Sequence, residues 1–116
     1  MRIVRLKIGK SFFSASIASA VIIFGSGGQV GDALSAECRR LGLHFLAPSL
    51  SQVNFEAPQS VENWLNTQAG PAAPRAVINA AAFTQVDLAE SQEHQATQIN
   101  AHAPAFIASW CAKREL

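Results

Sequence analysis

The chain of 116 residues contains no tyrosine, only two cysteines, and charged side chains at only 15% of its positions. The missing tyrosine removes one catalytic role, that of a phenol acting as a proton donor. Two cysteines are too few for a disulfide framework to replace a hydrophobic core. With 49% hydrophobic residues, seven glycines and five prolines, the composition is that of one globular domain. It excludes a disordered or collagen-like chain.

Positive charge is concentrated at the start of the chain. Residues 1–20 hold four basic side chains and no acid, whereas the remainder holds five basic and eight acidic residues. A mildly acidic body lacks the basic surface that binds phosphate backbones. We therefore expect no nucleic-acid partner.

Residues 1–20 form a basic and apolar N-terminal extension that has two interpretations. The basic arm and the apolar residues after it resemble a secretory signal, with Ala18-Ser19-Ala20 as the cleavage site. Alternatively, Val21–Phe24 is the first buried strand and residues 1–20 lie upstream of it. The apolar stretch from Phe12 to Phe24 has 13 residues, fewer than the roughly 20 that span a bilayer. We expect no membrane partner and a cytoplasmic location, with export as the alternative if residues 1–20 act as a signal peptide.

From Ala20 onward, short apolar runs alternate with segments of helical period, which is typical of an α/β fold with a parallel sheet. We expect residues 21–116 to form part of a doubly wound parallel sheet. The predicted strands are Val21–Phe24, Leu43–Ala47, Ala76–Asn79 and, as a short additional strand, Gln52–Phe55.

Three helices are predicted between and after these strands. The apolar face of the first comprises Val30, Ala33, Leu34, Cys38 and Leu41, and Gly42 suits a left-handed cap. The second begins at Pro58, with Val61, Trp64 and Leu65 on one face. The last runs from about Glu93 to the C-terminus and contains Pro104, whose ring excludes a hydrogen bond to the Asn100 carbonyl and bends the axis. The apolar positions of this last helix are Ile99, Ala103, Phe106, Ile107, Trp110 and Cys111.

A G-x-x-G-x-x-G sequence, formed by Gly25, Gly28 and Gly31, lies between the first strand and the first helix. Gly25 permits a tight turn, Gly28 lets the backbone approach a pyrophosphate, and Gly31 allows close packing of helix on strand. The amides of Gly28, Gln29 and Val30 would face the phosphates at the positive end of the helix dipole. The motif predicts binding of a nicotinamide dinucleotide, NADP(H) or NAD(H), and the alternative is a merely flexible loop.

The acid that usually binds the adenosine ribose about 20 residues after such a motif is missing, since no acid occurs between Glu37 and Glu56. Ser49 or a neighbour stands at the end of the second predicted strand. Because no carboxylate would repel a 2′-phosphate there, we expect NADPH to be tolerated.

The sequence N-A-A-A-F-T-Q-V-D-L-A-E at Asn79–Glu90, followed by Ile99-Asn100-Ala101, resembles the dTDP-4-dehydrorhamnose reductase family of extended short-chain dehydrogenases/reductases. The resemblance covers about residues 20–116. Together with the glycine motif, it implies that residues 21–116 form the N-terminal half of a Rossmann-type, doubly wound NAD(P)-binding domain. It implies a reductase that transfers hydride from a nicotinamide cofactor to dTDP-4-dehydro-L-rhamnose, giving dTDP-L-rhamnose for polysaccharide biosynthesis. A dTDP-sugar is then the partner of the full-length protein.

The same resemblance implies which residues contact the cofactor. Gly28, Gln29 and Val30 match the pyrophosphate contacts, Asn54-Phe55 resembles a pair beside the adenine, and Ala80–Thr84 resembles a loop running toward the nicotinamide. For Ala80, simple packing against helices is the alternative. No catalytic or metal-binding residue is assigned. The candidate cofactor-binding residues are Gly25, Gly28, Gln29, Val30, Gly31, Asn54, Phe55, Ala80, Ala81, Ala82, Phe83 and Thr84.

The chain departs from the family at its catalytic centre. The family uses the tyrosine of a Tyr-x-x-x-Lys motif as proton donor, and this chain has no tyrosine and stops at Lys113–Leu116, before that segment and the substrate-binding lobe. We expect these residues alone to be inactive, and we expect an exposed sheet edge beside Ala76–Asn79 that invites pairing. The alternatives are a non-catalytic nucleotide-binding or regulatory module, or part of another sugar-nucleotide dehydrogenase or epimerase. Whether the chain forms a homodimer stays open.

Cysteine and histidine residues give no sign of a metal site. Cys38 and Cys111 each fall on an apolar helix face, and we expect both to be buried free thiols. The three histidines have no metal-ligand spacing.

Overall fold

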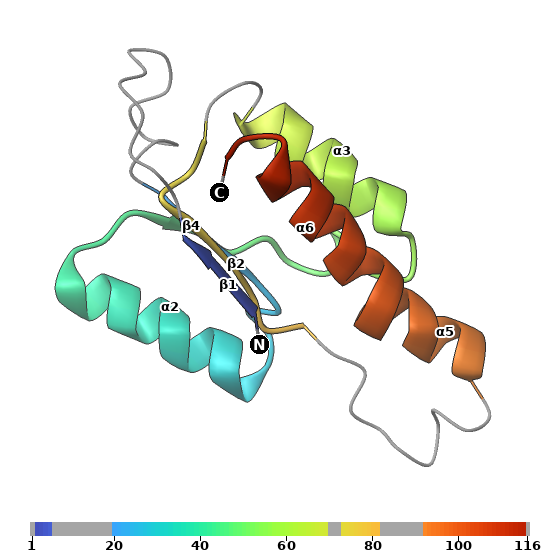
Figure 1. Ribbon diagram of the computed structural model, residues 1–116. Helices are drawn as coiled ribbons and strands as arrows, with labels where there is room; N and C mark the ends of the chain where they lie inside the picture. The colour runs from blue at the N-terminus through green and yellow to red at the C-terminus, as the bar shows by residue number, and fades with distance from the viewer. Residues whose placement is uncertain (1, 6–19, 70–72, 82–91, 116) are drawn as a thin grey trace.

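A four-stranded sheet flanked by helices forms the protein, as a computed structural model shows for residues 2–5, 20–69, 73–81 and 92–115 (Figure 1). The strand order is β1-β4-β2-β3. The strands are β1 (Arg2–Arg5), β2 (Val21–Phe24), β3 (Phe45–Leu46) and β4 (Ala76–Asn79). The helices are α2 (Gln29–Leu41), α3 (Pro58–Ala69), α5 (Glu93–Thr97), the π-helix η1 (Gln98–His102) and α6 (Ala103–Ala112). The predicted strands at Val21–Phe24 and Ala76–Asn79 are confirmed.

The parallel strands β3, β2 and β4 lie between two helical layers. Helix α2 covers one face of the sheet, and α3 and α6 cover the other (Figure 1). Side chains of β2 alternate between the layers: Val21 and Ile23 pack with Cys38 of α2, whereas Ile22 and Phe24 join the core under α3 and α6. Because both faces are covered, β2 is a continuous apolar run. This three-layer parallel arrangement confirms the predicted α/β, Rossmann-type fold.

The outer edge of β4 is not exposed, so the prediction of an open edge there was wrong. Strand β1 pairs antiparallel with β4, in a register that places Arg2 opposite Asn79 and Arg5 opposite Ala76. Part of the N-terminal extension therefore belongs to the sheet. Residues 6–19, which hold most of the signal-like segment, lie outside the described residues.

The second predicted strand is shorter than expected, and the additional one is absent. Strand β3 is limited to Phe45–Leu46 because Leu43 N–H donates to Cys38 O at 2.9 Å in the helix cap. Beyond it, Pro48 supplies no donor. The prediction of a strand at Gln52–Phe55 was wrong, since Gln52 and Val53 both donate to Ser49 O at 3.0 Å within a turn. Local turns take the backbone hydrogen bonds that a strand would need.

Helix α2 ends as predicted but presents a different face to the sheet. Gly42 adopts the left-handed conformation (φ 68°), and its N–H donates to carbonyls of the last turn. The buried residues are Gly31, Ser35 and Cys38, whereas Val30 and Leu41 are 50% and 54% exposed. Of the predicted apolar face, only Cys38 is fully buried. The close packing of Gly31 on the strand-to-helix turn fixes this rotation of the helix.

The last helical region begins at Glu93 as predicted but is interrupted. Residues Gln98–His102 form a π-helical turn, in which Ala103 N–H donates to Gln98 O five residues back. Pro104 follows as one of the first residues of α6. Pro104 has no backbone N–H to donate, and at a helix start a missing N–H costs little. The expected distortion is confirmed and takes the form of a π-bulge.

Helices α3 and α6 pack together over the sheet. Val61 and Leu65 of α3 are fully buried, which confirms the predicted face, and Ile107 and Trp110 of α6 belong to the same core. Trp110 Nε1 donates to Asn66 Oδ1 at 2.9 Å and joins the two helices. Cys38 and Cys111 are both buried and neither forms a disulfide, as predicted. Within the described residues, no helix combines the length and hydrophobicity needed to cross a bilayer.

Candidate functional site

The carboxyl ends of the three parallel strands meet at one edge of the sheet. From β2 the chain passes to β3 on one side, and β4 lies on the other side. This is a topological switch point, the position at which open α/β sheets bind ligands.

The turn after β2 requires glycine at its first position. Gly25 has φ +85°, and a Cβ placed on it would lie 2.5 Å from Ala81 N and 2.6 Å from Ala80 C. Gly28 N–H donates to Gly25 O at 3.1 Å and closes the turn. Asn79, which is buried, accepts a hydrogen bond from Ala81 N–H at 3.1 Å through its Oδ1 and directs the backbone after β4 over this turn.

Gly31 is required for the packing of α2 on the same turn. A Cβ on Gly31 would lie 2.0 Å from Gly25 O and 2.8 Å from Ser26 Cα. Since these are backbone atoms, no side-chain adjustment relieves the overlap. The glycine brings the start of α2 into direct contact with the end of β2.

Gly28 differs from the other two, because the fold itself does not require a glycine there. It is the N-cap of α2 with φ −93° and ψ 171°, an extended conformation open to any residue. A Cβ on it would meet only Gly25 O, at an ordinary 3.6 Å. The N-cap makes no side-chain hydrogen bond to the helix. No side chain therefore caps the backbone at the start of α2, and Gln29 and Val30 are exposed. This arrangement fits an anion approaching the helix N-terminus.

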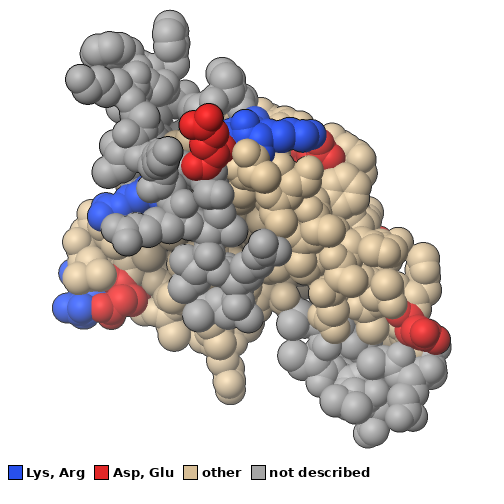
Figure 2. Space-filling model, viewed as in Figure 1, with Lys and Arg blue, Asp and Glu red and all other residues tan. Residues whose placement is uncertain are grey.

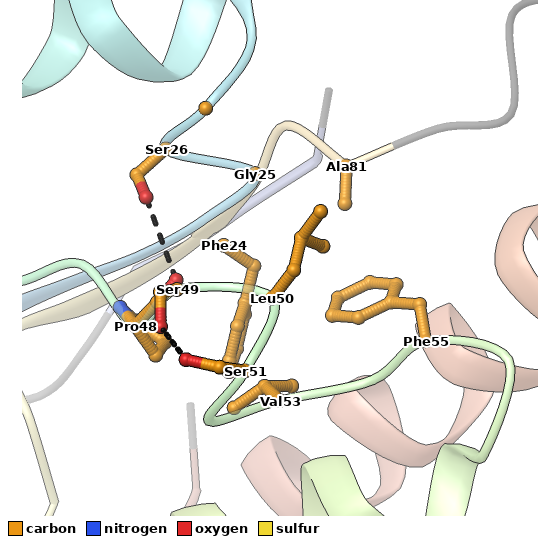
Figure 3. Close-up of a pocket in the computed structure, with 11 residues that line it drawn as sticks. Phe24, Gly25, Ser26, Pro48, Ser49, Leu50, Ser51, Val53, Phe55 and Ala81 are labelled. Carbon is orange, nitrogen blue, oxygen red and sulfur yellow. Dashed lines mark hydrogen bonds between the residues drawn. The ribbon is translucent and has the colours of Figure 1, made fainter.

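A cleft of about 380 Å³ opens beside the turn (Figure 3). Its size lies within the range of small-molecule sites, roughly 300–1,000 Å³. The inner wall is apolar: Phe24, Val53 and Phe55 are at most 6% exposed, and the rings of Phe24 and Phe55 meet edge to face at 5.6 Å. The residues that line the cleft are Phe24, Gly25, Ser26, Gly27, Pro48, Ser49, Leu50, Ser51, Val53, Phe55 and Ala81.

Hydroxyl groups occupy the polar side of the cleft. Ser49 Oγ and Ser51 Oγ lie 2.7 Å apart, and Ser26 Oγ donates to Pro48 O at 3.4 Å (Figure 3). Among the described residues that line the cleft, none is an acid. The described part of this wall thus offers hydroxyl groups and no carboxylate.

The structure places eight of the twelve sequence-predicted residues at the cleft or beside it. Gly25, Phe55 and Ala81 line the cleft. Gly28, Gln29, Val30 and Gly31 form the adjacent helix start, although the Gly28 amide is engaged by Gly25 O. Ala80 contacts the turn, and Ala82, Phe83 and Thr84 lie outside the described residues.

Asn54 is exposed and does not line the cleft. Its Oδ1 accepts a hydrogen bond from Glu56 N–H at 2.9 Å, and its backbone N–H and C=O both bind the Ser60 hydroxyl. Asn54 therefore shapes the loop that carries Phe55. Its predicted contact with the adenine stays a prediction.

Sequence reasoning missed most of the loop after β3, including Pro48, Leu50, Ser51 and Val53. Leu50 is 83% exposed, and its side chain extends past the Phe55 ring toward Ala81 (Figure 3). An isolated leucine among serines, directly after a predicted strand of a parallel sheet, was the signal that was available.

Charged side chains do not gather on the face of the molecule shown in Figure 2. There the described Lys and Arg residues are scattered, with Asp and Glu among them. Glu37 and Arg40 on α2 form an exposed ion pair, which lowers the pKa of the Glu37 carboxyl.

The parallel sheet, the glycine turn and the cleft at the switch point define an α/β protein of the Rossmann type. Residues 19–116 match the model of the family described as RmlD substrate binding domain, and the chain belongs to this family. The dTDP-4-dehydrorhamnose reductase of Mycobacterium tuberculosis (strain CDC 1551 / Oshkosh) is 38% identical over 93 residues, covering 80% of this chain and 29% of the relative. That of Mycolicibacterium smegmatis is 34% identical over 96 residues, covering 83% of this chain and 28% of the relative.

Solved structures agree with this assignment. The dTDP-4-dehydrorhamnose reductase from Bacillus anthracis, in complex with NADP, superposes with a TM-score of 0.63 and 26% identity over 78% of this chain and 31% of that chain. The reductase from Yersinia enterocolitica, at 20% identity and a TM-score of 0.66 over 77% of this chain and 30% of that chain, supports the fold alone. The chain thus spans less than a third of the length of these relatives.

Proposed function

We propose that this chain binds a nicotinamide dinucleotide, NADP(H) or NAD(H), at the glycine turn and its cleft. The observation that carries the proposal concerns Gly28. The fold has room for a Cβ at this position, so packing does not explain the glycine. Without a side chain, Gly28 leaves the N-terminus of α2 open to a ligand. The NADP complex of the Bacillus anthracis relative supports the identity of the ligand.

Different groups of the described residues bind different parts of the cofactor in this proposal. The exposed amides of Gln29 and Val30 face the pyrophosphate, aided by the helix dipole. The apolar wall of Phe24, Val53 and Phe55 accommodates the adenine, and the Ser49 and Ser51 hydroxyls are placed to bind the adenosine ribose. Because none of the described lining residues is an acid, these residues present no like charge to a 2′-phosphate.

We further propose that the chain supplies the cofactor-binding half of a dTDP-4-dehydrorhamnose reductase. When bound, the reduced cofactor supplies the hydride for a sugar-nucleotide carbonyl. This chain's own contribution is to hold the cofactor at the switch point, and its backbone at Ala80 and Ala81 leads from β4 toward the reacting end. It has no tyrosine to donate a proton, and on its own it is inactive. The buried thiols of Cys38 and Cys111, which form no disulfide, suit a reducing cytoplasm.

Calorimetric titration of the purified chain with NADPH and with NADH tests the binding proposal. We expect saturable heat with both cofactors, with a Kd at or below the millimolar range. Gly28→Val would place a branched side chain where the pyrophosphate approaches and should abolish the heat. Thr67→Val, on the exposed side of α3, introduces the same residue away from the cleft and should leave binding unchanged. Absence of heat with the folded parent chain would contradict the proposal.

An activity assay tests whether this chain can catalyse the reduction on its own. NADPH absorbance at 340 nm is followed with dTDP-4-dehydro-L-rhamnose and the pure chain. We expect no oxidation above the rate without protein. Sustained turnover by the pure chain would show that another group replaces the tyrosine.

A further inference from the structure

Val53 and Phe55 form the inner wall of the cleft together with Phe24, and both come from the loop between β3 and α3 (Figure 3). They are 3% and 6% exposed, whereas Asn54 between them is exposed. This alternation is that of a strand, in which every second side chain points to the same face. Among the described strands, however, none pairs with this segment, so another group must hold it in place.

A side chain of α3 takes the place of a paired strand. Asn54 N–H donates to Ser60 Oγ at 3.0 Å, and the Ser60 hydroxyl donates to Asn54 O at 2.9 Å. One hydroxyl thus satisfies both backbone groups of the residue that separates Val53 from Phe55, as a neighbouring strand would. Because its donor and one acceptor position are both in use, the hydroxyl fixes the backbone of Asn54 relative to α3.

Capping of α3 does not account for Ser60. An N-cap residue precedes the helix and accepts a hydrogen bond from an N–H of the first turn. Ser60 is instead the third residue of α3 (Pro58–Ala69), and its hydroxyl bonds to Asn54, which lies before the helix begins. Ala57, the residue that precedes the helix, has no side-chain oxygen. The Ser60 hydroxyl therefore serves the loop rather than the helix.

The helix that carries Ser60 is firmly packed on the core. Val61 and Leu65 of α3 are fully buried. The ring of Trp64, on the same helix, meets the Phe24 ring edge to face, with the centroids 5.7 Å apart. Ser60 therefore ties the loop to a fixed support. A wall that is ordered before the ligand arrives costs less affinity than one that the ligand must order.

We propose that Ser60 is a positioning residue for the cofactor: its hydroxyl holds the loop so that Val53 and Phe55 form the wall that receives the adenine. The inference rests on the proposed function, which places the adenine against this wall. It adds a residue that is not among the lining residues of the cleft and that acts only through Asn54.

Removal of the hydroxyl should weaken ligands that use the wall and spare a ligand that does not. ADP carries an adenine and a diphosphate, whereas inorganic pyrophosphate has no group for the wall and can bind only at the start of α2. Calorimetric titration of the full chain measures the affinities of NADPH, ADP and pyrophosphate. We expect Ser60→Ala to bind NADPH and ADP about fivefold more weakly, because fewer chains hold the wall in place before binding. Pyrophosphate should bind with unchanged affinity.

Two further variants separate the hydroxyl from other effects of the substitution. Ser60→Thr keeps the hydroxyl and should restore the affinity for ADP to within about twofold of the parent chain. Ser109→Ala removes the same group from an exposed position of α6 and should bind all three ligands as the parent does. A weakening of pyrophosphate equal to that of ADP would mean that Ser60 supports the fold in general, and it would overturn the inference.

Hydrogen exchange provides a measurement that needs no ligand. The Asn54 amide should exchange at least about tenfold faster in Ser60→Ala than in the parent chain, because its acceptor is gone. The Leu65 amide, in the interior of α3, should exchange at the same rate in both chains. Equal exchange at Asn54 in the two chains would overturn the inference.

The titrations distinguish failure of this inference from failure of the proposed function. If the parent chain binds NADPH and Ser60→Ala binds it equally well, the cofactor site stands and the role assigned to Ser60 is wrong. If the folded parent chain binds neither NADPH nor ADP, the proposed function fails and this inference fails with it.

Discussion

Gly31 and Gly25 approach so closely that a Cβ on Gly31 would lie 2.0 Å from the carbonyl oxygen of Gly25. This contact joins the start of α2 to the end of β2 and leaves no room for any side chain. Three residues earlier, a Cβ on Gly28 would meet nothing nearer than 3.6 Å. Two glycines of one motif thus differ: the packing of the fold requires Gly31, whereas Gly28 has no such requirement, and we propose that it leaves room for a ligand.

The first prediction follows from this difference. Gly31→Ala should destabilise the fold by about 3 kcal/mol, because the added methyl overlaps backbone atoms that cannot move independently. Gly28→Ala should cost less than about 1 kcal/mol, since its φ and ψ suit alanine and the space is open. Urea unfolding followed by circular dichroism measures both. Similar losses of stability would contradict the separation of roles.

Leu50 provides a test of the cleft that does not disturb the core. Its side chain is 83% exposed, so Leu50→Ser should leave stability unchanged while weakening NADPH binding about fivefold through lost apolar contact. Leu41→Ser changes a comparably exposed leucine, 54% exposed, at the far end of α2 and should leave affinity unaltered. If the two variants bind NADPH equally well, the loop after β3 does not contact the cofactor.

Much of the fold could be predicted from the sequence, because the central elements depend on local patterns. A continuous apolar run marked β2, and Gly42 marked the end of α2 through the left-handed conformation that glycine adopts readily. The pairing of β1 with β4 could not be read in this way, since it joins residues more than 70 positions apart. Val53 and Phe55 alternate as in a strand, yet local turn hydrogen bonds hold them in a loop.

The candidate site was predictable to a similar degree. The glycine spacing located the turn, because Gly25 and Gly31 answer backbone requirements that the sequence displays directly. The walls of the cleft depend on how the loop after β3 folds back over Phe24. That fold depends on the Ser49 and Asn54 turns, whose hydrogen bonds leave no periodic signal.

The contact between α3 and α6 gives a stability prediction remote from the cleft. Trp110 is 3% exposed, and its Nε1 donates to Asn66 Oδ1. Asn66→Ala should cost about 1–2 kcal/mol, because a buried indole N–H loses its acceptor. Asn63→Ala, one turn earlier on the same helix and exposed, should cost much less. Thermal unfolding of the two variants provides the comparison, and equal costs would mean that water replaces Asn66 without penalty.

Cys38 predicts how stability changes at alkaline pH. Burial raises the pKa of its thiol above the ordinary value of 9.0, and the neighbouring Glu37 carboxylate raises it further. The folded state therefore favours the neutral thiol, so this contribution is complete below pH 9 and is lost as the pH rises through the folded pKa. No tyrosine titrates in the same range.

Urea unfolding midpoints measured from pH 8 to pH 10.5 test whether the Cys38 thiol makes the fold less stable as the pH rises. The parent chain should lose more stability over that interval than Cys38→Ala, which has no thiol at that position to ionise. A parent chain that gains stability relative to Cys38→Ala as the pH rises would show that the thiolate is favoured in the fold.

Backbone amide shifts in ¹H–¹⁵N spectra recorded during an NADPH titration test the central claim most directly. The amides of Gln29 and Val30 should show the largest changes, with smaller changes at Ser49 and Ser51 and none along α6. Saturable shifts confined to other parts of the chain, with Gln29 and Val30 unmoved, would contradict binding of the pyrophosphate at the start of α2.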